Sequence, residues 1–295
     1  MEMWQYEFMR RAMAAGLMVA WLCPLVGMLV VVRRQSLLGD GLGHIAFAGV
    51  TASAWWGIYP PLGAMAVTLL AALGIERVRR RHRHYSDMGL ALFFYAGLAS
   101  AIVFASLANV SSAGIMSFLF GSILTVTSTE LIGMAAVTAV VTGLLWICRR
   151  ELVALAFDEA VARVNGVRVD LLQTMFALLI AGVVVLGMTV VGILLVSALM
   201  IVPVAAAHLW RQNFARTTGI ALGYSLLAVV GGLVLSYQYD LAPGGTIVLT
   251  GLAAYVLTWW CTALRRRAGH GAAPMTDGRK TDADSDDSDG SCGGR

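Results

Sequence analysis

The sequence predicts an all-α polytopic membrane protein with about nine transmembrane helices, and a count of eight to ten fits the same pattern. Three observations lead to this prediction. The 295-residue chain is 59% hydrophobic and 13% charged, whereas an average soluble domain carries about 25% charged residues. Its apolar residues gather into long runs, and crossing a bilayer takes about 20 residues of helix. Short segments rich in arginine separate these runs at every second connection.

The apolar runs follow one another along most of the chain. They cover residues 12–32, 38–59, 62–75, 88–107, 131–147, 171–186, 190–207, 218–237 and 245–264. The third run is short, so we expect it to be tilted or partly interfacial. Residues 111–126 are rich in Ser and Gly, and we expect a re-entrant or short periplasmic element there, because irregular backbone at membrane depth must contact protein or water. The sixth and seventh runs are nearly continuous through residues 187–192 (GMTVVG), where a tight turn and a broken helix both fit.

The arginines predict how the chain is oriented. They occur in the connections at residues 33–34, 77–83, 149–168, 211–216 and 265–267, and the alternate connections contain neither Lys nor Arg. Cytoplasmic loops carry such an excess of positive charge, so we expect these connections and the C-terminus to be cytoplasmic. Only Arg10 and Arg11 disagree; they would face outside or belong to an interfacial helix. We divide the chain into a membrane domain of residues 1–267 and a disordered, acidic cytoplasmic tail of residues 268–295.

The polar pair Asp40 and His44 lies at the start of the second apolar run. The two residues are four apart and therefore share a helix face. A carboxylate and an imidazole on one face are ligands for divalent transition metals, and ionisable residues within membrane segments usually serve function. Alternatively, Asp40 caps the helix and His44 is a satisfied core histidine. The residues alone do not decide between a metal pathway and these structural roles.

Other patterns exclude several function classes. The sole lysine, Lys280, lies in the tail, and no lysine-bearing phosphate loop, HExxH or GxSxG motif occurs, so we do not expect an enzyme. The four cysteines are widely spaced and form no CxxC pair, which argues against a zinc ribbon. The arginines are dispersed along the chain, so the partner they indicate is the lipid bilayer and not a nucleic acid.

The cytoplasmic connection at residues 149–170 carries a short helical pattern. Asp158 suits the N-cap position and Gly166 the position after the last turn, while Phe157, Val161 and Val164 form an apolar edge. Such a helix is either a connector on the membrane surface or a docking element that enters a groove on another protein.

Four blocks of the sequence carry a family resemblance. They are VVVRRQSLLGDGLGHIAFAGV (30–50), RRELVALAFDEAVARVNGVRV (149–169), VVGILLVSALMIVPVAAAHLW (190–210) and LSYQYDLAPGGTIVL (235–249). In this order they resemble the permease subunits of the zinc/manganese/iron class of bacterial ABC importers, which are fed by cluster-9-type binding proteins. The resemblance covers roughly residues 7–264. The chain departs from the family pattern at Gly41 and Gly43, where Ala and Ser are usual, and at His208, where Arg or Tyr is frequent.

The resemblance implies partners, a cargo and site residues. It implies a homodimeric permease in the bacterial inner membrane, with cytoplasmic ABC ATPase subunits and an extracytoplasmic metal-binding protein. No cofactor would be permanently bound, and the cargo would be a divalent transition metal, with zinc favoured and manganese or iron as alternatives. It places Asp40 and His44 in the metal pathway. The expected coupling residues are Phe157, Asp158, Glu159, Ala162 and Gly166, and further candidates for the pathway or its gate are Ser197, Pro203 and His208.

Two other transport mechanisms share some of these features. A secondary metal-ion transporter would also have apolar spans and a buried Asp/His pair, but it gives no reason for a docking helix. An ABC permease for a metal chelate would need a wider pathway with fewer metal ligands.

Overall fold

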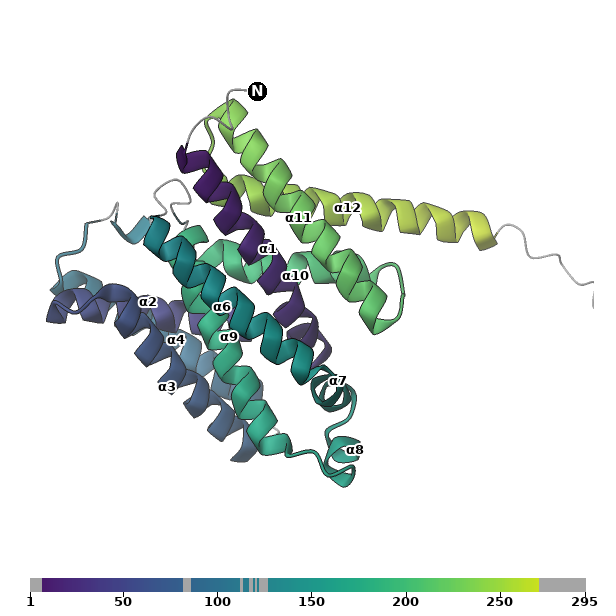
Figure 1. The fold of residues 1–295 in the computed structure, drawn as a ribbon, viewed down its shortest axis with the longest axis horizontal. Coiled ribbons are helices and arrows are strands. Elements are labelled where there is room, and N and C mark those ends of the chain that lie inside the picture. The colour runs from purple at the N-terminus through teal and green to yellow at the C-terminus, as the bar shows by residue number, and fades with distance from the viewer. Residues whose placement is uncertain are drawn as a thin grey trace, which may run out of the picture.

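The computed structural model describes residues 7–81, 86–111, 114–116, 119, 121 and 127–270. These residues form helices and connections, with no strand among them. The long helices are α1 (Glu7–Val32), α2 (Leu38–Trp56), α3 (Pro60–Arg81), α4 (Ser86–Leu107), α6 (Ser128–Ile147), α9 (Val169–Val191), α10 (Ile193–His208), α11 (Phe214–Tyr239) and α12 (Pro243–His270). Two short helices, α7 (Arg149–Phe157) and α8 (Glu159–Val164), connect α6 to α9 (Figure 1). The predicted all-α membrane fold is confirmed.

The count of nine spans is approximate. In the described part of the chain, seven of the nine long helices are long and apolar enough to cross a membrane. The other two are α10, which has only 16 residues, and α2, in which 14 of 19 residues are buried by neighbouring helices. A helix that is surrounded by protein does not need the apolar surface that lipid requires. The small and polar residues of α2 are therefore compatible with a place inside the bundle.

The helices form two groups that α9 connects. On one side α2 packs against α3 and α4, and on the other α1, α10, α11 and α12 pack against one another (Figure 1). Helix α9 contacts α2 and α3 as well as α1 and α10. Glycines allow close approach at several of these crossings: Gly49 faces the backbone of α3, and Gly27 faces the Met200 carbonyl of α10. Small residues at helix crossings are typical of membrane bundles, where packing drives association.

Two expectations about individual helices are now decided. The third helix is not short, because α3 continues to Arg81. Glu76 extends it beyond the apolar run through ion pairs with Arg79 (2.7 Å) and Arg80 (3.0 Å). Between α9 and α10 the chain makes a tight turn at Gly192, whose φ is 85°. A side chain at Gly187 would meet Val196 at 2.5 Å, so the beginning of α10 packs against the end of α9.

Two predicted segments lie largely or wholly outside the described residues. The first is the expected re-entrant element at residues 111–126. Its described side chains Ile115 and Leu119 pack against a buried cluster that includes Phe47 of α2. The backbone at Gly121 (φ 75°) lies against Val191. The tail beyond residue 270 is outside the described residues, and its disorder remains a prediction.

The crossing of α1 and α10 makes a testable prediction. A methyl group at Gly27 would lie 2.0 Å from the Met200 carbonyl oxygen, so Gly27→Ala must move backbone, and overpacking typically costs about 1–3 kcal/mol. We expect a lower thermal unfolding temperature in detergent. Gly143→Ala is the matched control, because no atom outside its own helix turn lies within 4 Å of that position. Equal stability of the two variants would contradict the close crossing.

Candidate metal pathway and coupling elements

Asp40 lies in the first turn of α2 and does not cap it. The N-cap residue is Leu37, which makes no side-chain capping bond. Within the described residues the Asp40 carboxylate has no hydrogen bond or ion pair. The positive end of the helix dipole stabilises a carboxylate in this position. The structure therefore leaves both Asp40 oxygens available to a ligand.

His44 follows one turn later and is not a satisfied core histidine. Its ring meets Phe94 of α4 edge-on, with centroids 4.8 Å apart and an interplanar angle of 77°. Its Nδ1 atom is buried and has no hydrogen-bond partner in the described structure. A buried polar atom without a partner is rare in native proteins and calls for an explanation. A bound cation would provide one, since neutral imidazole nitrogens are metal ligands.

The surroundings of α2 show which direction the pair faces. Leu38 and Leu42 line a cavity shared with α3 and α9. Gly41 faces Leu90 of α4, and Gly43 faces Ile193 of α10. Because residues of a helix are spaced by about 100°, Asp40 and His44 occupy the remaining direction, between α4 and α10. Both side chains are half-buried there.

The two glycines that depart from the family pattern have different structural consequences. A methyl group at Gly41 would be in ordinary contact with Leu90, at 3.4 Å. A methyl group at Gly43 would lie only 2.6 Å from Ile193 Cγ2. Gly43 thus allows α10 to approach α2 more closely than a serine would, whereas Gly41 imposes no such constraint.

The candidates on α10 do not gather around the pair. Ser197 is buried and is placed close to α2, because a Cβ at Gly39 would lie 4.0 Å from the Ser197 Cβ. Pro203 and His208 lie about 9 and 16 Å farther along the helix axis, and His208 is exposed at its end. Only Ser197 is therefore beside the Asp40 turn. Among the described residues, no group of three or more potential metal ligands occurs.

The coupling connection forms the local structure that its sequence predicts. The Asp158 carboxylate accepts hydrogen bonds from the backbone N–H groups of Ala160 (2.8 Å) and Val161 (3.1 Å), and Gly166 adopts a left-handed φ of 79° after the last turn. Ala162 is fully buried, whereas Val164 is 88% exposed. Phe157, 69% exposed, ends α7 and does not belong to α8. This exposed apolar edge suits a docking surface.

A network of charges connects α8 to the membrane helices. Arg163 of α8 lies 3.3 Å from Glu159 and 3.7 Å from Asp170, at the start of α9. Arg80 of α3 donates to the Asp170 carbonyl and to Thr174 Oγ1, and its guanidinium also pairs with Glu76. Glu76 is buried in the bundle. These charge-assisted contacts thus join α8 to both α3 and α9.

Arg33 lies where this network meets a cavity beneath α2. Its guanidinium is 5.3 Å from the Phe176 ring centre, and it lines the cavity of about 250 Å³ beneath Leu38 and Leu42. Burial and, second, the nearby Arg79 lower the pKa of Arg33 to about 10, against the opposing influence of Glu76 and Glu159. The group stays charged at neutral pH. Positive charge thus borders this cavity, which neither Asp40 nor His44 lines.

Comparison with known proteins identifies the family. Residues 5–262 match the ABC 3 transport family. The chain belongs to the ABC 3 transport family. A probable metal transport system membrane protein of Treponema pallidum is 37% identical over 264 residues, which cover 90% of this chain and 99% of that protein. The manganese transport system membrane protein MntC of Listeria monocytogenes is 29% identical, with coverage of 86% and 91%.

A solved structure extends the match to three dimensions. PsaBC from Streptococcus pneumoniae, determined in complex with Fab, is similar with a TM-score of 0.78 and 28% identity, over 88% of this chain and 93% of that one. This ABC 3 chain is therefore a membrane permease, and ATP hydrolysis resides in a separate subunit. The resemblance that the four sequence blocks carry is confirmed.

Sequence reasoning about the ABC 3 permease missed the charge network. The sequence pattern indicates only orientation for the arginines after Ile75, and it places Asp170 at the end of a loop. The spacing of Glu76 and Arg80, four residues apart, is a signal for a helical ion pair. No local pattern, however, reveals that Arg80 reaches α9, since these residues are 90 positions apart.

Stability measurements can separate the two parts of the network. Glu76→Gln leaves two arginines without their buried carboxylate, and we expect a loss of about 2 kcal/mol, less than for a fully buried pair, because both arginines are partly exposed. Asp170→Asn disturbs exposed pairs and should cost below about 1 kcal/mol. Thermal unfolding in detergent measures both. A larger loss for Asp170→Asn than for Glu76→Gln would show that the network is organised differently.

Proposed function

We propose that this ABC 3 permease is the membrane subunit of an ATP-driven importer of divalent transition-metal ions. The observation that carries the proposal is the Asp40–His44 pair: an unpaired carboxylate and a buried imidazole nitrogen without a partner, one turn apart. Relatives that are named for metal transport and for manganese transport support the same cargo class. Zinc and manganese both accept this ligand set, so we propose the class and leave zinc and manganese as its two leading members.

We further propose that the working unit is a homodimer. One protomer offers two ligands in the described structure, and zinc favours four. The half-buried direction between α4 and α10 faces away from the protomer's own α3 and α9. A twofold axis on this side would bring two Asp40–His44 pairs toward one path. A transit site of this kind must bind weakly enough to release its ion.

The partners and orientation follow from the same proposal. A cytoplasmic ABC ATPase would dock on the exposed edge of α8, and an extracytoplasmic metal-binding protein would deliver the ion. In this arrangement the arginine-bearing connections and the C-terminus face the cytoplasm of the bacterial inner membrane. Movement of α8 would reach α3 and α9 through Arg163, Asp170 and Arg80, and so change the cavity beneath α2. This direct connection to a docking helix favours ATP-driven import over a secondary transporter.

Metal uptake tests the pathway. We expect Asp40→Ala and His44→Ala each to reduce uptake of radioactive zinc or manganese by at least roughly tenfold, since even indirect ligand partners affect metal sites by this factor. Thr51→Ala is the control on the same helix, because the Thr51 hydroxyl bonds only to carbonyls of its own helix. Normal uptake by either pathway variant, at normal abundance in the membrane, would refute the assignment.

Co-purification of the ATPase tests the docking surface. Glu159→Arg breaks the pair with Arg163 and reverses a charge on α8, so we expect several-fold less ATPase in a pull-down. Glu7→Arg is a matched control: Glu7 also pairs with an arginine four residues later, Arg11, but at the beginning of α1. If both variants retain the ATPase equally, α8 is not the docking element.

A further inference from the structure

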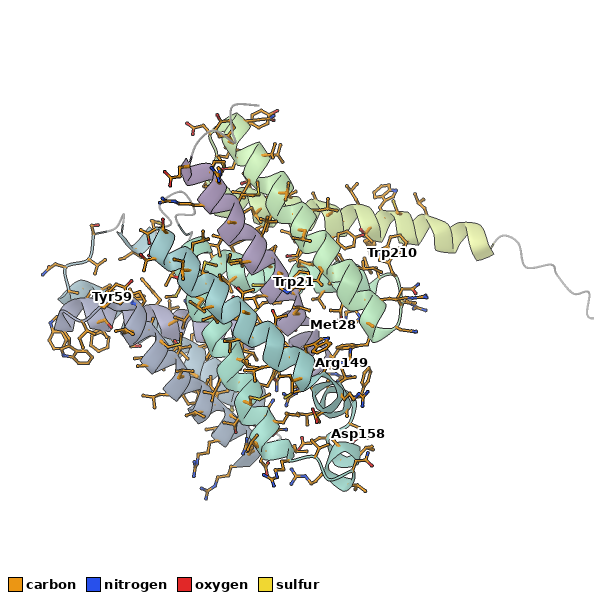
Figure 2. The ribbon with its side chains drawn as sticks, viewed as in Figure 1. Trp21, Met28, Tyr59, Arg149, Asp158 and Trp210 are labelled. Carbon is orange, nitrogen blue, oxygen red and sulfur yellow. The ribbon has the colours of Figure 1, made fainter. Side chains whose placement is uncertain are left out.

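A groove between α1, α6, α7 and α11 has no part in the proposed transport path. It has a volume of about 220 Å³ and an almost entirely apolar wall. Helix α1 contributes Trp21, Leu25 and Leu29, and α6 contributes Leu145 and Trp146. Figure 2 shows Trp21 and Arg149 on the near face of the molecule, with Arg149 close to α7. The Asp40–His44 pair faces between α4 and α10, which do not line this groove.

The groove is elongated along the membrane helices. Trp21, Leu25 and Leu29 are four residues apart, so they extend over about 12 Å of α1. At one end the groove reaches α7, the first part of the proposed coupling connection, and the start of α11. In the orientation that we propose above, this end lies at the cytoplasmic surface of the bilayer. The groove then has the depth of one leaflet's acyl chains.

Arg149 gives this end of the groove a positive charge. It lies at the mouth, with its guanidinium carbon 5.6 Å from the centre of the Trp146 ring. Among the described residues it forms no ion pair. Arginine on an aromatic ring at a membrane surface leaves its N–H groups free for a phosphate, which it binds with two parallel hydrogen bonds. Tryptophans such as Trp21 and Trp146 are typical of the depth at which lipid acyl chains meet the headgroups.

We propose that this groove binds an anionic phospholipid of the cytoplasmic leaflet, with an acyl chain along α1 and the phosphate at Arg149. Charge complementarity and the apolar lining both select this occupant. The site also touches the coupling region: Leu152 of α7 and Phe214 of α11 line it, and the Phe214 ring is 6.3 Å from that of Phe157. A bound lipid therefore supports the helix from which the coupling connection departs.

Fluorescence quenching by brominated lipids tests the site in the full-length protein. Trp21 and Trp146 report on the groove, and their signal is the difference between the protein and its Trp21→Phe/Trp146→Phe variant. The nanodiscs contain phosphatidylglycerol and phosphatidylcholine, and only one of the two lipids is brominated in each sample. We expect the brominated anionic lipid to quench roughly fivefold more strongly, because an arginine near the surface contributes about 1 kcal/mol to the binding of an anionic lipid. Arg149→Gln should abolish the preference and Arg149→Lys should retain most of it.

The adjacent Arg150 provides the matched control. It is exposed and does not line the groove, so Arg150→Gln should keep the preference. Added inorganic phosphate should not reduce the quenching, because the acyl chain holds the lipid in place. Three results would overturn the proposal: no headgroup preference, a preference that survives in Arg149→Gln, or no quenching because a second copy of the chain covers the groove. None of them bears on metal uptake through Asp40 and His44, so the two proposals fail separately.

Discussion

The close packing of α2 among its neighbours is the constraint on which the rest of the structure depends. Glycines allow this close packing: Gly49 lies against the backbone of α3, and Gly43 lies against the Ile193 side chain of α10. Once these directions are filled, the two ionisable side chains of the helix have a single direction left. Asp40 and His44 therefore face the gap between α4 and α10. The unpaired Nδ1 of His44 is a consequence of the same packing, since Phe94 offers its ring no hydrogen-bond acceptor.

The charges at the α8 end of the bundle connect this packing to a short, exposed helix. Ion pairs at a surface contribute little to stability. The Arg163–Asp170–Arg80 network therefore matters for which helices it connects. It joins a short, exposed helix to two membrane helices that enclose the cavity beneath α2. A transporter needs this kind of link, because energy from one subunit must alter the surroundings of an ion in another. Arg33, partly buried on Phe176, lies at the point where the link meets the cavity.

Local patterns in the sequence were sufficient for much of the fold and part of the site. Apolar runs predict nine helices, and Asp158 and Gly166 predict where α8 begins and ends. Asp40 and His44 are conspicuous because they are ionisable in an apolar helix. The length of α3 was underestimated, because hydropathy falls at Glu76 although the helix continues through ion pairs. The sequence does not decide between a broken helix and a tight turn at Gly192, because a glycine permits both; the contact of Gly187 with Val196 shows that the turn is tight.

What the sequence by itself determined is the membrane fold class, the family through its four blocks, and the chemical character of the pair on α2. These properties depend on composition and on spacings within one or two helical turns. The tertiary structure alone decided which direction Asp40 and His44 face, that Ser197 lies beside them while His208 does not, and that Arg80 connects α3 to α9. Each of these facts involves residues far apart in the chain. Helix periodicity relates only neighbours in sequence, whereas packing between helices depends on the shapes of both surfaces.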